Sequence, residues 1–408
     1  SKGKAKADEL MSAAEALTQK GDIPGAVRTY LKALQINPRA YTAYNRLRYN
    51  LMRYDIAEGD PLLQEIVEVC KRIIEQHPSL QIARVTLAYG LTRLGKTQAA
   101  TACYRHAGEL TMQPAKRIKG EMPSDEKEET YSDRRQHREQ ETPRTLDFMV
   151  IGAEKCGTTS LFQYLAQHPQ IASPIEKEID FFDQEYKHGL DWYLAHFPAF
   201  GDGAFGERES GEGAIAPKKI TSQIVGETSA NYLYNKLVPE RVHQHFPNVQ
   251  LVVLLRHPVD RTLSRYNMMV RNGNEARSLE TVISQEMAQI QKATTAEGIP
   301  WPVLNRCRHI GNSLYAYHLQ HWLAHFSREQ LLAIQSESLF TQSQATLGTL
   351  CQTLKITPPP AQDYKKHNAG EYATASLELR QQLAEFYHPH VRKLEELLSQ
   401  SFDWDLAS

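Results

Sequence analysis

The chain has 408 residues, and 41% of them are hydrophobic, which is enough to bury a large core and favours two domains over one. The formal net charge is −1 at pH 7, so the chain as a whole attracts neither nucleic acid nor an anionic membrane. An anion site would therefore have to be a local arrangement of basic groups and backbone amides.

The cysteines and the apolar segments bear on where the protein works. Five cysteines are scattered along the chain without a CxxC pair, which argues against a zinc or redox site and is typical of a reducing cytoplasm. No apolar run is long enough to cross a bilayer, and the first residues, SKGKAKADEL, do not resemble a secretion signal. We therefore expect a cytoplasmic protein without a transmembrane segment. The sequence leaves open whether a leader preceded Ser1.

Residues 1–112 contain two segments in which small and aromatic residues have the same spacing. The first is marked by Ala16, Gly21, Ala26, Tyr30, Ala33 and Pro38, and the second by Gly95, Ala100, Tyr104 and Ala107. The spacing resembles that of tetratricopeptide repeats, in which alanines let two helices approach, glycine forms the turn and tyrosine fills the remaining gap. We predict a tetratricopeptide-like helical domain, with an alanine-rich bundle as the alternative. Such a domain either binds a protein partner or supports its neighbour.

A change of composition separates this region from the rest of the chain. Residues 113–145 carry mixed charges and almost no apolar side chains, which is typical of a solvated linker. In residues 146–408, apolar strands such as LDFMVIGA and VQLVVLLRHP alternate with amphipathic helices such as TTSLFQYLAQHP. Continuous apolar strands are usually buried on both faces of a parallel sheet. We therefore predict an α/β domain with a P-loop-like parallel sheet flanked by helices.

The stretch FMVIGAEKCGTTSLFQYLAQHP, residues 148–169, joins a strand to a helix through a loop between two glycines. Gly152 and Gly157 have the spacing of the nucleotide-binding motif GxxxxGK[ST], but Thr158 follows the second glycine and the lysine lies earlier, at Lys155. The early position of the lysine does not fit an ATP- or GTP-binding loop, and it argues against an ATP-dependent kinase. The first amides of the helix still point along a dipole that favours an anion.

A second segment, VVLLRHPVDRTLSRY, places Arg256 at the end of a strand and Ser264 one or two turns into the following helix. Such side chains suit a phosphate, the arginine through charge-assisted bonds and the serine through its hydroxyl. Together the two segments resemble the 5′-phosphosulfate loop and the 3′-phosphate element of sulfotransferases. The resemblance implies their fold and their sulfuryl donor, 3′-phosphoadenosine 5′-phosphosulfate (PAPS), with adenosine 3′,5′-bisphosphate as product.

Further segments indicate which group of sulfotransferases the chain resembles. KEIDFFDQEYKHGLDWYLAHFP and GETSANYL are similar to the segments that follow the loop in heparan sulfate N- and 3-O-sulfotransferases, and the similarity extends over residues 147–405. Animal members of that group carry a disulfide near the C-terminus, whereas PPPAQDYKKHNAGEYATASLE holds no cysteine here, in agreement with a cytoplasmic setting. In this stretch Lys365 and Lys366 either close over the cofactor or are plain surface residues.

The resemblance also implies roles for single residues. Lys155 would steady the oxygen of the departing nucleotide, and Glu178 would accept the proton of the acceptor group. Glu227 is a second carboxylate candidate, as a supporting base, as the base itself or as the partner of a cation. The scheme needs no metal, and the sequence holds no HExxH, EF-hand or paired Cys/His pattern. The cofactor-binding candidates are Lys155, Cys156, Gly157, Thr158, Thr159, Ser160, Arg256, Ser264, Lys365 and Lys366.

Several of these features also have a simpler structural interpretation. Lys177 and Glu178 would form an exposed ion pair, the segment IDFFD would merely bury its two phenylalanines, and His257 would be structural rather than catalytic. A stretch with four arginines is expected to form a solvated basic face, with contact to an anionic acceptor as the alternative. These arginines are Arg261, Arg265, Arg271 and Arg277.

The sequence as a whole predicts a PAPS-dependent sulfotransferase that acts on a hydroxyl or an amine, with a carbohydrate as the favoured acceptor. One alternative is a sulfotransferase for a small metabolite or a protein tyrosine. Another is a nucleotide-binding scaffold that works through its helical repeats. The acceptor, the partner of the repeats and the oligomeric state cannot be named from the sequence.

Overall fold

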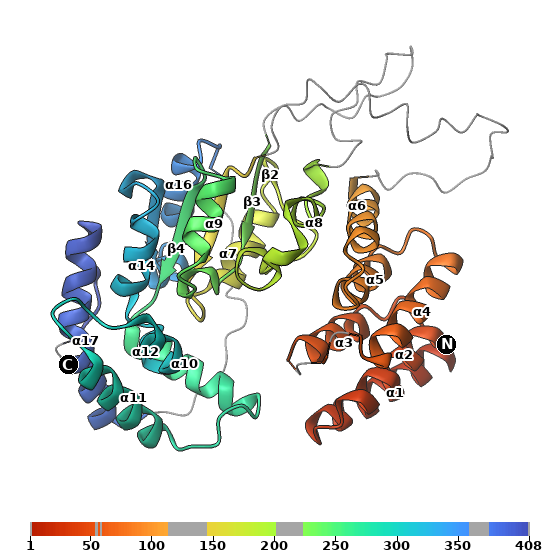
Figure 1. Ribbon diagram of the computed structural model, residues 1–408, viewed down its shortest axis with the longest axis horizontal. Helices are drawn as coiled ribbons and strands as arrows, with labels where there is room; N and C mark the ends of the chain where they lie inside the picture. Colours follow the sequence, from red (N-terminus) through yellow and green to blue (C-terminus); the bar gives the residue numbers. More distant parts are fainter. Residues whose placement is uncertain are drawn as a thin grey trace, which may run out of the picture. The chain divides into compact units, whose positions relative to one another are not determined.

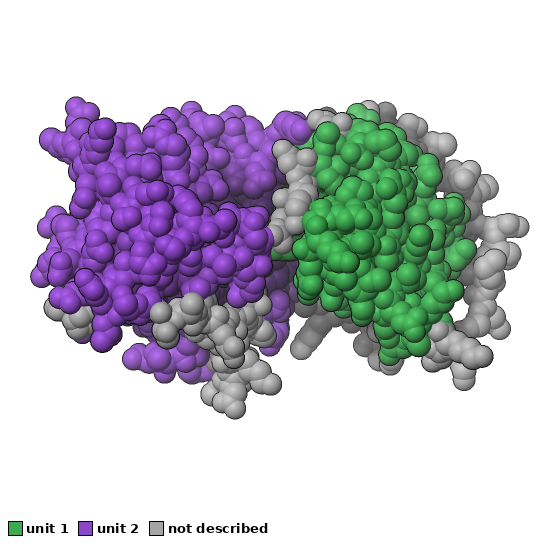
Figure 2. All heavy atoms as spheres, turned by 90° about the horizontal axis from the view of Figure 1, so that it is seen from below, with its two compact units in different colours: residues 1–144, 188–212 green, residues 145–187, 213–408 purple. Residues whose placement is uncertain are grey.

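The computed structural model describes residues 2–53, 56–57, 59–112, 145–200, 223–358 and 375–406. The chain forms two compact units, which Figure 2 distinguishes by colour. One consists of residues 1–144 and 188–212, and the other of residues 145–187 and 213–408. Apart from residue 145, the predicted linker at 113–145 lies outside the described residues.

The first unit contains the helices α1 to α6 (Figure 1), in which α2 packs on α1, α3 and α4, and α5 packs on α3, α4 and α6. Two of them begin with an aspartate cap followed closely by proline: Asp22 accepts from the Gly25 N–H at 2.9 Å, and Asp60 accepts from the Leu62 N–H at 2.8 Å. The helices are α1 Lys2–Gln19, α2 Ile23–Ile36, α3 Tyr41–Arg53, α4 Pro61–Gln76, α5 Gln81–Arg93 and α6 Thr97–Met112.

The small and aromatic residues that suggested helical repeats lie inside this unit. In α2, Ala26 and Ala33 are fully buried beside Tyr30, and Ala100, Tyr104 and Ala107 repeat the arrangement in α6. The sequence did not reveal the helices α3 and α4, which lie between these two segments. The packing of α1 on α2 and of α5 on α6 agrees with the predicted repeats, although their assignment as tetratricopeptide repeats stays an interpretation.

The helical unit also contains a segment from much later in the chain, residues 188–200. Its helix α8, Leu190–Leu194, presents Trp192, whose Nε1 donates to Thr92 Oγ1 at 3.0 Å. The rings of His196 and Tyr104 lie 3.8 Å apart between centroids. The predicted division at residue 146 therefore differs from the units of the structure, because this segment packs on α5 and α6.

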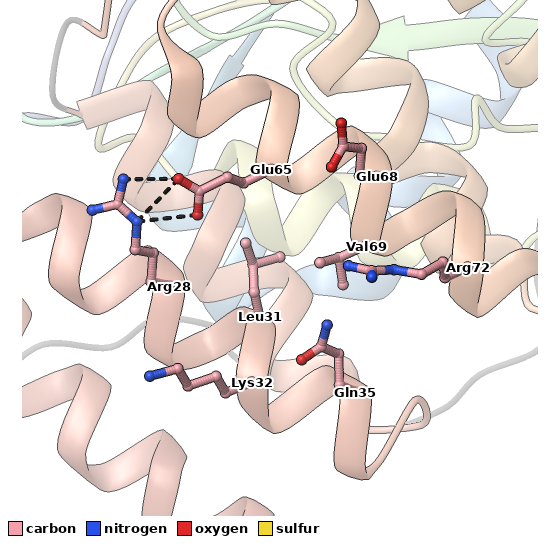
Figure 3. Close-up of a pocket in the computed structure, with 8 residues that line it drawn as sticks. All are labelled: Arg28, Leu31, Lys32, Gln35, Glu65, Glu68, Val69 and Arg72. Carbon is pink, nitrogen blue, oxygen red and sulfur yellow. Dashed lines mark hydrogen bonds and ion pairs between the residues drawn. The ribbon is translucent and has the colours of Figure 1, made fainter.

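A pocket of about 230 Å³ lies between α2 and α4 of the same unit, and Figure 3 shows the side chains that line it. Leu31 and Val69 form its apolar part, and the ion pair of Arg28 with Glu65, at 2.8 Å, crosses it. The pocket contains none of the residues that the sequence proposes for anion binding.

The second unit contains a sheet of five parallel strands in the order β2-β3-β1-β4-β5, with helices around it (Figure 1). The predicted α/β fold is therefore confirmed. The strands are β1 Phe148–Gly152, β2 Ile171–Ala172, β3 Ile224–Thr228, β4 Gln250–Leu255 and β5 Leu331–Gln335. The main helices are α7 Thr158–Ala166, α9 Val238–His245, α10 Pro258–Arg271, α11 Leu279–Ala293, α12 Trp301–Arg306, α13 Arg308–Gly311, α14 Tyr315–Leu323, α15 Ser336–Thr341, α16 Ser343–Thr353 and α17 Leu377–Leu398.

The central strands carry the core of this unit. All five residues of β1 and the last five of β4 are buried, as expected for strands covered on both faces. Because β1 lies between β3 and β4, the carboxyl ends of these three strands meet at one edge of the sheet, where ligands of open α/β sheets usually bind. Within the described ranges, no helix combines the length and apolar character that a membrane span requires.

Candidate active site

The loop between β1 and α7, residues 153–157, is called the anion loop below. It turns tightly, with the Cys156 N–H donating to the Ala153 carbonyl at 3.1 Å. Lys155 has φ 69° and Gly157 has φ 93°, both in the left-handed region. A side chain at Gly157 would meet Phe340 at 3.0 Å, so glycine is required there by conformation and by space.

The helix that follows offers its amino terminus at the carboxyl edge of the sheet. Its first internal backbone bond runs from the Leu161 N–H to the Gly157 carbonyl at 3.0 Å, so the amides before Leu161 precede the helical ladder. Thr158 and Ser160 are buried, and Thr159 is half-buried. The predicted apolar face, Leu161, Tyr164 and Leu165, is buried. The helix dipole at this end favours an anion.

Cys156 belongs to the support of the loop. Its thiol is fully buried, lies 3.7 Å from the Tyr315 hydroxyl, and has its pKa raised to about 11 by burial. Ser336 Oγ donates to the Cys156 carbonyl at 2.6 Å. Since its N–H also bonds inside the loop, Cys156 uses its groups to hold the turn. The sequence did not point to Tyr315 or Ser336, because an isolated hydroxyl carries no motif.

Arg256 follows β4 and lies against the anion loop. Its Nη1 donates to the Lys155 carbonyl at 3.3 Å, and its own carbonyl accepts from the Tyr315 hydroxyl at 2.9 Å. The next residue, His257, donates its N–H to Glu337 Oε1 at 2.8 Å, which fits the structural role expected for it. The two predicted anion elements thus meet at one edge. Ser264 lies two turns into α10 and is 2% exposed.

The expected solvated basic face is wrong for two of its four arginines. Arg261 is 0% exposed and Arg265 is 7% exposed. Both bind the carboxylate of Glu154 in the anion loop, which neutralises charges that burial would otherwise disfavour. Arg271 and Arg277 are exposed, as expected.

The segment Lys177–Asp183, called the carboxylate segment below, runs beside the end of β3. The Glu178 N–H donates to the Thr228 carbonyl at 3.0 Å, and Glu178 has φ 59°. Its side chain is 37% exposed and pairs with Lys177, whose side chain is 19% exposed, so the ion pair of the simpler interpretation forms but is only partly exposed. Thr228 is aligned with Val150 of β1, so Glu178 lies at the same edge of the sheet as the anion loop. A non-glycine residue in this conformation is typical of functional sites.

The other carboxylates of this region are less accessible. Glu227 is 1% exposed and accepts from Ser229 Oγ at 2.9 Å, which suits a supporting role better than contact with an acceptor. Burial, together with Asp183, Glu178 and Glu227, raises the pKa of Asp180 well above its usual value. Burial also raises the pKa of Asp183 to about 6. The phenylalanines between them, Phe181 and Phe182, are fully buried.

A family model described as "Sulfotransferase family" matches residues 147–360. The chain belongs to the sulfotransferase family. This confirms the family predicted from the anion loop and the Arg256 segment.

Relatives of this sulfotransferase include a bifunctional heparan sulfate N-deacetylase/N-sulfotransferase of Drosophila melanogaster, 33% identical over 230 residues, which cover 54% of this chain and 20% of the relative. The membrane-associated sulfotransferase kil1 of Dictyostelium discoideum is 25% identical over 354 residues, covering 67% of this chain and 72% of the relative. A sulfotransferase structure from Alicyclobacillus acidocaldarius has 26% identity and a TM-score of 0.46, covering 64% of this chain and 98% of that one. The chain spans about a fifth of the length of the Drosophila enzyme.

The sulfotransferase site thus combines two chemically different halves at one sheet edge. One half contains Lys155, Arg256 and the amino terminus of α7, and the other contains the carboxylate of Glu178. Lys365 and Lys366 lie outside the described residues. In the part of the chain that the structure describes, no group of three or more His, Cys, Asp or Glu side chains is placed to hold a metal ion.

Proposed function

We propose that this sulfotransferase moves a sulfuryl group from PAPS to a hydroxyl or an amine of a carbohydrate. The observation that carries the proposal is the bond between the two anion elements, in which Arg256 donates to the carbonyl of Lys155. This contact joins the guanidinium of Arg256 to the backbone of the loop that carries Lys155 and that leads into the amino terminus of α7. Such a set of donors fits a nucleotide that carries separate phosphate and phosphosulfate groups.

PAPS supplies the sulfuryl group, and the residues of the chain supply position and charge. Lys155 and the first amides of α7 stabilise the negative charge that develops on the phosphate oxygen when its bond to sulfur breaks. Glu178 accepts the proton from the acceptor oxygen or nitrogen as the new bond to sulfur forms. Arg256 and Ser264 would hold the 3′-phosphate and so fix the nucleotide in position for transfer.

The carbohydrate acceptor is supported by the relatives rather than by a contact in this structure. Several relatives are named for heparan sulfate N-sulfation, which is a reaction at an amine of a polysaccharide. The match to each of them covers only a part of that protein, so the acceptor of this chain is proposed as a class. We likewise propose a cytoplasmic location, which all five unpaired cysteines support, and keep partner binding by the helical unit as a prediction.

The decisive experiment offers labelled PAPS with a panel of glycans, phenols and peptides and measures transfer. We expect label on an amine- or hydroxyl-bearing glycan, and no transfer by a Lys155→Ala variant that remains folded. Calorimetry on the same protein should show tighter binding of adenosine 3′,5′-bisphosphate than of AMP. Tighter binding of ATP with magnesium, or bisphosphate binding without transfer to any acceptor, would contradict the proposal, the second result favouring a nucleotide-binding scaffold.

A further inference from the structure

A buried group of three charges lies behind the anion loop. Glu154, next to Lys155, turns its carboxylate inward, where its side chain is 19% exposed. Glu154 Oε2 accepts from Arg261 Nη2 at 3.3 Å and also from Arg265. The main chain of the same residue is held as well: its N–H donates to the Tyr234 hydroxyl at 3.1 Å, and its carbonyl accepts from Arg261 Nε at 3.3 Å. The Oε2 atom, the N–H and the carbonyl of Glu154 therefore all have partners.

Arg261 is itself fixed to a second element, so it is a rigid support for the loop. Its Nη1 donates to the carbonyls of His309 at 3.0 Å and Arg308 at 3.3 Å, and to Ser313 Oγ at 3.2 Å. A guanidinium offers its donors in a planar fork, and here that fork joins the loop to α10 and α13. The helix that carries Ser264 is thereby tied to the loop that carries Lys155.

The conformation of Lys155 explains why such a support is needed. Its φ of 69° lies in a region that non-glycine residues seldom adopt and that persists only where the surroundings determine it. On one side Glu154 is held by the two arginines, and on the other the Lys155 carbonyl accepts from Arg256. Without the first support, the turn is free to relax toward an ordinary backbone conformation, which redirects the ammonium.

The charge of Glu154 also has to be reconciled with an anion site. Burial disfavours its ionised form, but Arg265 and Arg261 outweigh burial and hold the pKa of the carboxyl below its usual value. Glu154 is therefore ionised, and two guanidiniums offset its charge. A buried ion group is weak evidence for stability and is better attested as a device that fixes one arrangement among several.

We propose that Glu154, held by Arg261 and Arg265, is a positioning residue that directs the Lys155 ammonium toward the departing phosphate oxygen. The inference rests on the proposed function, because it assigns a task to Lys155 within sulfuryl transfer. Glu154 acts through its neighbour and touches neither the donor nor the acceptor.

The test compares Glu154→Gln, Arg265→Lys and the double variant with the parent protein. Bisphosphate affinity is measured by calorimetry, and kcat is measured at saturating PAPS and acceptor, below the melting temperature of each variant. We expect kcat to fall about 10- to 100-fold in Glu154→Gln, because small misplacements of a reacting group have effects of this size. The dissociation constant should change less than about threefold, since Arg256 and the helix amides remain.

The double variant separates positioning from general damage. If Arg265 acts through Glu154, Arg265→Lys lowers kcat in the parent background but adds little to Glu154→Gln, so the effects do not multiply. The matched control is Arg380→Gln on α17, which breaks an ion pair to Asp260 on α10, the helix that also carries Arg261 and Arg265. The side chains of Arg380 and Asp260 are 39% and 35% exposed. The control should keep parent kcat and affinity. Should Glu154→Gln fail to fold, Arg265→Lys alone tests the same contact.

A parent-like kcat in Glu154→Gln, or losses that multiply in the double variant, overturns the inference and leaves the proposed function intact. A loss of kcat that only follows the unfolded fraction, measured by circular dichroism, overturns it as well. If the parent protein binds no bisphosphate and transfers no label, the proposed function fails, and this inference fails with it.

Discussion

The anion loop and the carboxylate segment lie at the same edge of one sheet, yet they hold their charges in opposite ways. In the loop, the carboxylate of Glu154 is surrounded by guanidinium groups, and its pKa is held below the usual value. In the carboxylate segment, Asp180 is desolvated beside other carboxyl groups, and its pKa is raised. The same kind of side chain is thus tuned in two directions within one site.

This difference matches the chemistry of the two halves. An anion-binding loop needs fixed positive charge and must keep its own carboxylate neutralised, which Arg261 and Arg265 accomplish. In the carboxylate segment, burial raises the pKa of Asp180 and of Asp183, which lie two and five residues after Glu178. The side chain of Glu178 is 37% exposed, whereas Glu227 of the neighbouring strand β3 is 1% exposed, so Glu178 is the more accessible of the two candidate bases.

The largest effect should come from the exposed carboxylate. Glu178→Gln keeps the size of the side chain but removes its basicity, so transfer should fall roughly 10²- to 10⁴-fold while bisphosphate affinity stays near that of the parent. Rates are measured at saturating PAPS and acceptor, with folding checked by circular dichroism. The control is Glu240→Gln, an exposed position on α9, which should keep the parent rate.

Two results would contradict the assignment of Glu178 as the base. If Glu178→Gln transfers at the parent rate while a folded Glu227→Gln is inactive, the buried carboxylate is the base. If both glutamine variants are fully active, the base lies elsewhere, and the assignment made by resemblance to the heparan sulfate enzymes fails at this position.

The next effect concerns the loop side of the site and affects binding rather than rate. Arg256→Ala removes the guanidinium proposed for the 3′-phosphate, which should cost about 2–5 kcal/mol of binding free energy by analogy with truncated charge pairs. Bisphosphate affinity should therefore fall roughly 30- to 5,000-fold, and AMP affinity much less. Calorimetry with both nucleotides measures this, and the exposed Arg392→Ala is the control. Equal losses for the two nucleotides would show that Arg256 does not recognise the 3′-phosphate.

Sequence patterns predicted the framework of the site because that framework rests on local signals. The apolar strands before Lys155 and Arg256 and the helices after them are where the patterns placed them. Each follows from hydrophobic periodicity and from turn residues that lie close together in the chain. The parallel sheet follows from the same continuous apolar strands.

The supports of the site could not be predicted in this way, because their partners are distant in sequence. Arg261 and Arg265 lie 107 and 111 residues after Glu154, and on a polar helix they look like solvated side chains. Tyr315 and Ser336 hold Cys156 from 159 and 180 residues away. No local spacing distinguishes such side chains from surface residues.

The segment that contains Trp192 shows the same limit at the level of whole elements. Its apolar side chains are compatible with any apolar partner, and the sequence placed it in the α/β domain. In the structure, Trp192 instead donates to Thr92 of α5, 100 residues earlier in the chain.

The smallest effect is on stability. It tests directly whether the pKa of a carboxyl is raised in the carboxylate segment and lowered in the anion loop. The pKa of Asp183 is raised from 3.8 to about 6 by burial, so between about pH 4 and pH 6 the folded protein binds more protons than the unfolded chain. The free energy of unfolding that Asp183 contributes therefore falls as pH rises through this interval, and stays low above it. Asp183→Asn removes this loss. The free energy of unfolding of the variant minus that of the parent should therefore be about 1–3 kcal/mol larger at pH 7 than at pH 4.

Glu154→Gln should show the reverse pH dependence. A carboxyl with a lowered pKa stabilises the fold above the pKa that it has in the unfolded chain, and it loses that contribution as pH falls. Urea unfolding of both variants and the parent at pH 4, 5, 6 and 7 measures these trends, and the same sign of pH dependence in both variants would remove the distinction between the two halves of the site.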